Sequence, residues 1–202
     1  MPTALTTAVW REALERIIRK LDACADELNS LDGQLGDGDL GVTMVRGARA
    51  VEVELPNLPD DLGLAFMKCA QAFTKLSGST YGTLLATGLM NAAKATKGRT
   101  ELPWLEVSPL IGNALQAMAQ RSGGHLGEKT VLDSIEAVRA ATQGLDDPAT
   151  MVTAADRAVA ECLDRFRNQA ARQGRARIFG ETSVGKDDPG MLAFQRMIEA
   201  LK

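Results

Sequence analysis

The sequence predicts an all-α fold, in which eight helices form an antiparallel up-and-down barrel or bundle. Apolar residues recur at intervals of three and four in eight segments, which is the spacing of one face of a helix. No segment shows the sustained alternation of apolar and polar residues that a half-buried strand requires. With 202 residues and a hydrophobic content of 45%, the chain fits a single domain, residues 1–202, with a substantial core.

The first four helices are indicated by apolar faces and, for two of them, by clear ends. The stretch from Pro56 to Pro59 stops the second helix, and Asp60 and Asp61 cap the third. The fourth is rich in Ala and Leu, so we expect it to be largely buried. Their apolar faces run from Trp10 to Leu31, from Met44 to Leu55, from Leu62 to Leu76 and from Leu84 to Thr96.

The last four helices follow the same pattern. Pro103 and Pro109 precede the fifth, and Gly144 closes the sixth. Residues 174–190 form a connection between the seventh and the eighth that is too long for a simple turn, and such loops are usually functional or disordered. The apolar faces run from Ile111 to Met118, from Val131 to Val138, from Val152 to Phe166 and from Met191 to Leu201.

Glycine gathers in the connections that this arrangement places at one end. In an up-and-down array, the joins after the first, third, fifth and seventh helices lie at the same end. Those joins, with the helix starts that follow them, contain 13 of the 19 glycines, and they span residues 33–41, 77–82, 122–130 and 174–190. We therefore expect one mouth of the bundle at which a single ligand touches all four loops.

The first of these joins carries the clearest chemistry. Asp32, Asp37 and Asp39 lie close together in a glycine-rich loop, where their mutual repulsion favours a bound hard cation. The helix that begins near Gly41 to Thr43 has free N–H groups suited to a phosphate. An EF-hand does not fit, because the twelfth residue from Asp32 is Thr43 rather than Glu. Capping of the next helix explains only one of the three aspartates, so we predict a Mg²⁺-nucleotide site.

The other three joins offer groups for the rest of a nucleotide. Ser79 and Thr80 form a second candidate phosphate cradle, or simply cap a helix. Gly123, Gly124 and Thr130 are expected near a base or ribose, or act only in capping. In the last join we expect Arg175, Arg177 and Lys186 to face phosphate oxygens, unless the segment is a solvated lid. Residues 127–130 are not a P-loop, because the lysine does not directly follow the last glycine.

Composition excludes several classes of protein. The net charge is −3 and no basic stripe alternates with aromatic residues, so nucleic-acid binding is not expected. No apolar run is long enough to span a membrane and no signal peptide is recognisable, so we expect a cytoplasmic protein. Cys24, Cys69 and Cys162 lie on apolar helix faces and are expected to be reduced core thiols. His125, the one histidine, is interpreted as a polar loop residue.

Taken together, the four loops resemble those of the L subunit of dihydroxyacetone kinase, the nucleotide-binding half of that enzyme. The family's Leu-Asp followed by Gly-Asp-Gly-Asp-His-Gly is matched by Leu31-Asp32 and by residues 36–41. Its Gly-Asp-Lys-Thr-Met-Leu-Asp run is similar to residues 127–133, and its Gly-Arg-Ala to Asp-Pro-Gly run is similar to residues 174–190. The family's Gly-Gly-x-Ser-Gly is the weakest match, at residues 78–82. The resemblance spans the whole chain in the same order.

The resemblance implies an eight-helix barrel with ADP or ATP and two Mg²⁺ ions at one mouth. It implies that Asp32, Asp37 and Asp39 hold the metal and that phosphoryl transfer to an alcohol group depends on metal positioning, with no catalytic side chain assigned. The residues that it places around the nucleotide are Leu40, Gly41, Val42, Thr43, Ser79, Thr80, Gly123, Gly124, Arg175, Asp188, Pro189 and Gly190.

In the family, a separate K subunit holds the sugar covalently through a histidine, so the resemblance implies that this chain needs such a partner. Some members exchange ATP, and others keep ADP as a coenzyme recharged by a phosphotransferase-system protein. Leu40, Tyr81 and Lys186 stand where the family tends to have His, Ser and His. These departures leave open an altered nucleotide mode or a kinase for a four-carbon ketose. A further alternative is a nucleotide-loaded module that contacts a transcription regulator.

Overall fold

The computed structural model describes residues 2–76 and 79–202, and the described chain is mostly helical, as predicted. Ser77 and Gly78, which belong to the second glycine-rich join, lie outside the described residues. The α-helices formed by the described residues are α1 Thr7–Ala23, α2 Ala25–Leu35, α3 Leu40–Glu54, α4 Leu62–Leu76, α5 Thr80–Thr96, α6 Val107–Ser122, α7 Val131–Thr142, α8 Pro148–Arg167 and α9 Pro189–Glu199.

The predicted first helix is two helices, because the chain breaks at Cys24. This residue has φ −108° and ψ 10°, outside the helical range, and it separates α1 from α2. Hydrogen bonds still cross the break: Cys24 N–H donates to the Lys20 carbonyl, and Leu28 N–H donates to the Cys24 carbonyl, both at 3.0 Å. The break is therefore a kink that leaves the apolar face in register, which is why apolar spacing alone did not reveal it.

Two short strands were also not predicted. β1 (Ala4–Thr6) pairs antiparallel with β2 (Glu101–Pro103), so that Leu5 lies opposite Leu102. Strands of three residues are too short to produce a recognisable alternation. Short 3₁₀ helices occupy Leu55–Asn57 (η1), Trp104–Glu106 (η2) and Arg175–Ser183 (η3), and the last of these lies within the long connection before α9.

The helices form a closed ring. From α3 onward each α-helix contacts the next one along the chain, α1 and α2 both contact α3, and α9 contacts α8 as well as α1. The main core accordingly joins side chains from distant parts of the sequence, such as Leu28, Met44, Val159 and Met191, all with 0% exposure. None of the helices built by residues 2–76 and 79–202 is long and apolar enough to cross a membrane.

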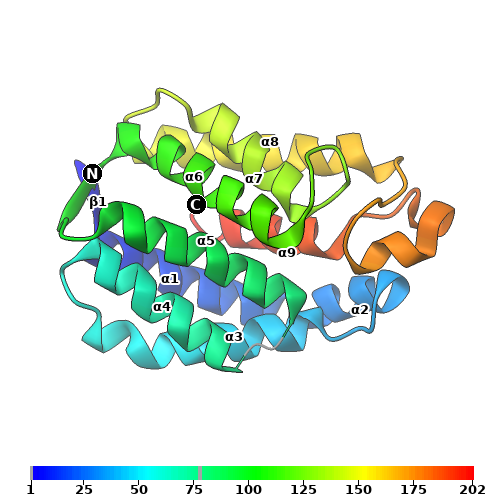
Figure 1. Cartoon of the computed structure of the whole chain (residues 1–202), viewed down its shortest axis with the longest axis horizontal. Coiled ribbons are helices and arrows are strands. Elements are labelled where there is room, and N and C mark those ends of the chain that lie inside the picture. Colours follow the sequence, from blue (N-terminus) through cyan, green and yellow to red (C-terminus); the bar gives the residue numbers. More distant parts are fainter. Residues whose placement is uncertain (1, 77–78) are drawn as a thin grey trace.

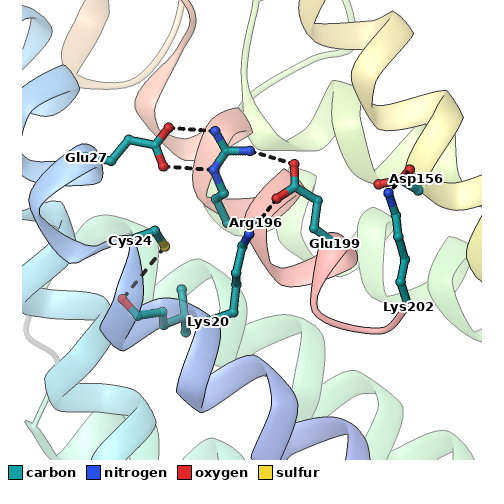
Figure 2. Close-up of polar contacts among 8 residues, drawn as sticks. Lys20, Cys24, Glu27, Asp156, Arg196, Glu199 and Lys202 are labelled. Atoms are coloured by element: carbon teal, nitrogen blue, oxygen red, sulfur yellow. Dashed lines mark hydrogen bonds and ion pairs between the residues drawn. The ribbon is translucent and has the colours of Figure 1, made fainter.

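A network of ion pairs lies where the ring closes, between α9 and the first two helices (Figure 2). The Arg196 guanidinium donates to both carboxylate oxygens of Glu27, at 2.6 and 2.8 Å, and to Glu199 at 2.6 Å. Lys20 reaches Glu199 at 2.9 Å. The hydrogen bond from Arg196 lowers the pKa of Glu27, and the bond to Glu27 raises the pKa of Arg196. The last helix is thereby fixed on both sides of the kink at Cys24.

The three cysteines are free and buried, as predicted. Burial raises the pKa of each thiol, that of Cys69 to about 11.

In Figure 1, α2 and the orange segment that contains η3 lie at one end of the molecule, whereas the N-terminus and β1 lie at the other.

A glycine sets how closely α3 packs against α4. A Cβ added at Gly47 would lie 2.4 Å from Cε2 of the buried Phe73 ring. We expect Gly47→Ala to lower the free energy of unfolding by about 1 to 3 kcal/mol, because the ring must leave its packed position. Urea titration followed by circular dichroism measures this change. Gly112→Ala is the matched helical control, because its Cβ would meet only the flexible Arg139 side chain, at 3.1 Å from Cδ. Equal stabilities of the two variants would contradict the argument.

Candidate functional site

The three predicted metal ligands come together between α2 and α3. Asp32 lies in the last turn of α2, and Asp37 and Asp39 lie in the loop that follows. One carboxylate oxygen from each can be chosen so that all three lie within 4.8 Å of one another. Asp32 is buried, whereas Asp37 and Asp39 are exposed. The group therefore combines a fixed inner carboxylate with two accessible outer ones.

The Asp32 carboxylate also shapes the loop. Its Oδ2 accepts hydrogen bonds from the backbone N–H groups of Gly38 at 2.9 Å, Asp39 at 3.0 Å and Leu40 at 3.3 Å. A Cβ at Gly36 would lie only 2.3 Å from Asp32 Oδ1, so a glycine is required at this close approach. The loop wraps around one carboxylate oxygen and leaves the other outside these three bonds.

Asn29 is a participant that the sequence did not indicate. Its Oδ1 accepts a hydrogen bond from Val42 N–H at 3.2 Å, in the first turn of α3. Gly41 allows this approach, because a Cβ there would lie 2.0 Å from the Ala25 carbonyl oxygen. Asn29 belongs to no motif and sits within a helix, so nothing in its spacing marks it.

The donor set fits a divalent cation. Three carboxylates so close together repel one another, and oxygen ligands of this kind are those that Mg²⁺ and Ca²⁺ prefer. Asp37 forms an ion pair with Arg175 from η3. Arg175 was predicted to face phosphate oxygens, and here its guanidinium supplies positive charge to the carboxylate group itself.

The first turn of α3 differs from a simple phosphate cradle. The N–H groups of Leu40 and Val42 are bound by Asp32 and Asn29, and that of Thr43 donates to the Asp39 carbonyl at 2.9 Å. The Leu40 side chain belongs to the main core, with 7% exposure, and Val42 is 40% exposed. The Leu40 side chain thus serves packing, and Val42 is the exposed member of this turn.

The second join is tied to the last one. Ser79 caps α5, accepting a hydrogen bond from Gly82 N–H at 2.9 Å, and Thr80 is exposed. The hydroxyl of Tyr81 donates to the Gly190 carbonyl at 2.9 Å, and burial, with a contribution from Asp188, raises the pKa of Tyr81. Tyr81 therefore fixes the start of α5 against the start of α9.

The third join uses most of its predicted groups in capping. Thr130 caps α7 in a capping box with Asp133, whose carboxylate accepts from Thr130 N–H at 2.9 Å and from Gly127 N–H at 2.6 Å. Gly123, with φ +66°, ends α6. Gly124 is buried and lines a cavity of about 470 Å³ between α6 and α7, together with Leu115, Leu126 and Leu132.

Asp188 caps α9 at the end of the fourth join. Its Oδ1 accepts a hydrogen bond from Met191 N–H at 2.9 Å, and Pro189 occupies the first helical position. Burial raises the pKa of this carboxyl to about 6, and its hydrogen bonds and Lys129 oppose that rise only in part. An acidic group that ionises with difficulty is a recurrent feature of functional sites.

Lys129 is the second residue that the sequence did not indicate. Its side chain is buried, with 1% exposure, and its ammonium donates to three backbone carbonyls of the segment that leads to α9. Backbone acceptors have no sequence signature, so the resemblance of residues 127–133 to the family's Gly-Asp-Lys-Thr-Met-Leu-Asp run gave Lys129 no role.

Direct contacts confirm the expectation that the four joins meet at one end. Arg175 pairs with Asp37 and links the fourth join to the first. Tyr81 links the second join to Gly190, and Lys129 links the third to the Ser183 carbonyl at 2.8 Å. The residues that these contacts connect all belong to the glycine-rich loops identified above.

The chain is similar to a family of kinase components. A family model described as the DAK2 domain matches residues 34–202. The ADP-binding subunit DhaL of the PEP-dependent dihydroxyacetone kinase of Escherichia coli K12 is 29% identical over 199 residues, which covers 92% of this chain and 94% of that subunit.

Two larger proteins contain a similar part. The L-erythrulose 1-kinase of Mycolicibacterium smegmatis is 31% identical over 206 residues, covering 95% of this chain and 36% of that kinase. The crystal structure of the dihydroxyacetone kinase from C. freundii in complex with AMP-PNP and Mg²⁺ has the same fold, with a TM-score of 0.79 and 23% identity. This match covers 100% of the present chain and 34% of that one. The chain thus spans about a third of these two enzymes.

The raised pKa of Asp188 leads to a prediction about stability. Because the folded-state pKa is about 6 rather than 3.8, the folded chain loses stability as the pH rises from about 4 to about 6. Asp188→Asn keeps the capping oxygen but cannot ionise. We expect this variant to be more stable than the parent by about 1 to 3 kcal/mol at pH 7.5, and the difference to vanish near pH 4. Thermal unfolding at the two pH values measures it.

Asp147→Asn is a matched control of opposite sign. Asp147 also caps a helix and precedes a proline, but the hydrogen bonds from Thr150 lower its pKa. Its carboxylate stabilises the fold above the unfolded-state pKa and loses that effect as the pH falls. Asp147→Asn should therefore be less stable than the parent at pH 7.5. Asparagine variants that shift stability in the same direction at both sites would contradict this interpretation of Asp188.

Proposed function

The chain belongs to the DAK2 domain family, and on this premise we propose that residues 1–202 form the nucleotide-binding unit of a small-ketose kinase whose sugar is held by a separate subunit. One observation carries the proposal, namely the group of Asp32, Asp37 and Asp39 with carboxylate oxygens within 4.8 Å of one another. The E. coli ADP-binding subunit, which is matched over 94% of its length, supports the assignment of this unit to nucleotide binding.

We propose that two Mg²⁺ ions and ADP or ATP bind at the mouth, and the C. freundii enzyme, which was crystallised in complex with AMP-PNP and Mg²⁺, supports a nucleotide and this metal. When bound, these ions neutralise phosphate charge and orient the groups for in-line transfer. In this proposal Asp32 keeps the loop in place through its three N–H bonds, and Asp37 and Asp39 offer their exposed oxygens. Arg175 leaves Asp37 and turns to the phosphates, for which a guanidinium is well suited.

The remaining nucleotide contacts follow the loops. Ser79, Thr80 and Arg175 are proposed to contact the phosphates. The cavity that Gly124 lines combines aliphatic side chains with a few polar ones, among them His125 and Gln116, and such a lining suits a base. The residues that we propose to line the nucleotide are Leu40, Gly41, Val42, Thr43, Ser79, Thr80, Gly123, Gly124, Thr130, Arg175, Asp188, Pro189 and Gly190. For Leu40 and Thr130 the backbone is the candidate group, because the Leu40 side chain is in the core and the Thr130 hydroxyl caps α7.

A partner subunit is supported by the surface around the mouth. Three of the large apolar side chains that are exposed lie on the glycine-rich joins, namely Leu126, Ile178 and Val184, with exposures of 55%, 76% and 38%, and Val42, with 40%, directly follows the first join in α3. We propose that they contact the ketose-binding K subunit. The PEP-dependent name of the E. coli relative supports ADP recharged by a phosphotransferase-system protein as the phosphoryl source.

A four-carbon ketose is a second candidate substrate. The M. smegmatis relative, at 31% identity, is an L-erythrulose 1-kinase. In either case the chain supplies the nucleotide and the partner selects the sugar, so assays with dihydroxyacetone and erythrulose and each partner subunit separate the two.

The metal assignment predicts the behaviour of Asp37→Asn. Saturating ADP with Mg²⁺ should raise the free energy of unfolding of the parent chain by about 3 kcal/mol. Asp37→Asn removes one carboxylate charge from the group, so this Mg²⁺-dependent increase should be lost while the far-ultraviolet circular dichroism stays unchanged. Thermal unfolding with Mg²⁺ alone, ADP alone and both together measures the effect. Asp146→Asn, in an exposed turn between α7 and α8, is the control. An unchanged response of Asp37→Asn would refute the metal assignment.

The proposed contact between the exposed apolar side chains at the mouth and the K subunit predicts that Ile178→Asp affects kinase activity but not nucleotide binding. A charge on this exposed residue should prevent burial against a partner, so the variant should lose kinase activity with the K subunit but bind Mg²⁺-ADP as the parent does. Val53→Asp is the matched control, because Val53 is 72% exposed but lies near the end of α3 remote from the mouth. Coupled assays with titrated K subunit and calorimetry with ADP measure the two properties. Equal activity of both variants would count against docking at this residue.

A further inference from the structure

The ammonium of Lys129 is enclosed by protein backbone. Nζ donates to the carbonyl oxygens of Gln169 and Ser183, both at 2.8 Å, and to that of Arg167 at 3.2 Å. An ammonium has three N–H donors, and all three are used. The residue also has φ +62°, and among the described residues it is the one non-glycine with a positive φ. A strained backbone and a buried charge persist only where the surroundings hold them in place.

The three carbonyls come from one segment, residues 167–187, which crosses from the end of α8 to the start of α9. The segment closes on itself: Gly185 N–H donates to the Arg167 carbonyl at 2.8 Å, and Ala171 N–H donates to the Ser183 hydroxyl at 2.8 Å. Arg167 pairs with Asp187 at 2.9 Å. The Lys129 ammonium therefore lies where the two ends of this loop meet.

The backbone on either side of Lys129 is itself held in place by hydrogen bonds. Asp133, in the first turn of α7, binds the N–H groups on both sides of it, at Gly127 and Thr130. Next to it, the Glu128 carbonyl accepts a hydrogen bond from Arg172 N–H at 3.1 Å. The Lys129 side chain thus connects the start of α7 to the segment that carries Arg175 and leads directly into Asp188.

We propose that Lys129 is a positioning residue whose caged ammonium orders residues 168–187 and thereby holds Arg175 and Asp188 at the mouth. The ordering of the segment follows from the contacts alone, and its effect on ligand binding rests on the proposed function. Without the ammonium, the carbonyl oxygens of Gln169 and Ser183 lose this donor, the Arg167 carbonyl keeps only Gly185 N–H, and the three oxygens converge without the positive charge between them. The segment then separates from α7, although the helices keep their own core.

The test compares Lys129→Ala and Lys129→Met in the full chain, with Lys94→Met, on the exposed face of α5, as the control. Hydrogen exchange followed by mass spectrometry should show lost protection over residues 168–187 in both Lys129 variants, with unchanged protection in the cores of α3 and α4. The calorimetric Kd for Mg²⁺-ADP should weaken by about tenfold or more, as when groups supporting a ligand shell are removed. The control should match the parent in both measurements.

Chemical rescue separates positioning from general damage. The alanine keeps Cβ, and n-propylammonium supplies the three missing carbons and the nitrogen, so it should restore both protection and affinity to Lys129→Ala. It should do neither for Lys129→Met, whose side chain fills the space, and n-propanol should rescue neither variant.

Each other outcome is decisive. Parent-like protection of residues 168–187, global unfolding of both variants, or rescue by n-propanol would overturn the inference. So would lost protection with an unchanged Kd. If the parent chain itself fails to bind Mg²⁺-ADP, the proposed function fails, and the exchange and rescue measurements still decide whether Lys129 orders the segment.

Discussion

The Asp32 carboxylate is the interaction on which the mouth depends. One of its oxygens accepts three consecutive backbone N–H groups, which fixes the path of the chain from α2 to α3. Those bonds bring Asp37 and Asp39 to the same place and set where α3 begins. A buried carboxylate that is bound in this way is stable without a metal, so the fold can present two further carboxylates beside it. Asp32 therefore has two roles, because it fixes the loop and belongs to the candidate metal-binding group.

The rest of the fold keeps this arrangement in register. The ring of helices closes where α9 meets α1 and α2, through Arg196 and its carboxylate partners. Because α2 ends at the aspartate loop and α9 begins at Asp188, this closure sets the distance between two parts of the mouth. The kink at Cys24 lies beside it. Packing far from the glycine-rich joins thus determines how they face one another.

The sequence allowed prediction of the features that depend on side-chain pattern. Apolar spacing gave the helices, and the glycine-rich joins with three aspartates gave the meeting point and the candidate ligands. Prediction from the sequence failed where hydrogen bonds to backbone groups, or backbone dihedral angles, determine the structure. The cage around Lys129 is made of carbonyls, Asn29 acts on an N–H group, and the break at Cys24 changes dihedral angles without disturbing the apolar face. The role of Leu40 was also not foreseeable, because only the packed structure shows its side chain in the core.

The burial of the cysteines has a consequence for redox chemistry. The thiolate is the reactive form of cysteine, and burial raises the pKa of all three thiols, so little thiolate is present near neutral pH. The chain should therefore be slow to oxidise and slow to react with maleimides. A single cysteine placed at the exposed position 178 would then be the one readily labelled thiol. A fluorophore attached there would detect changes at the mouth, without signal from labelled native cysteines.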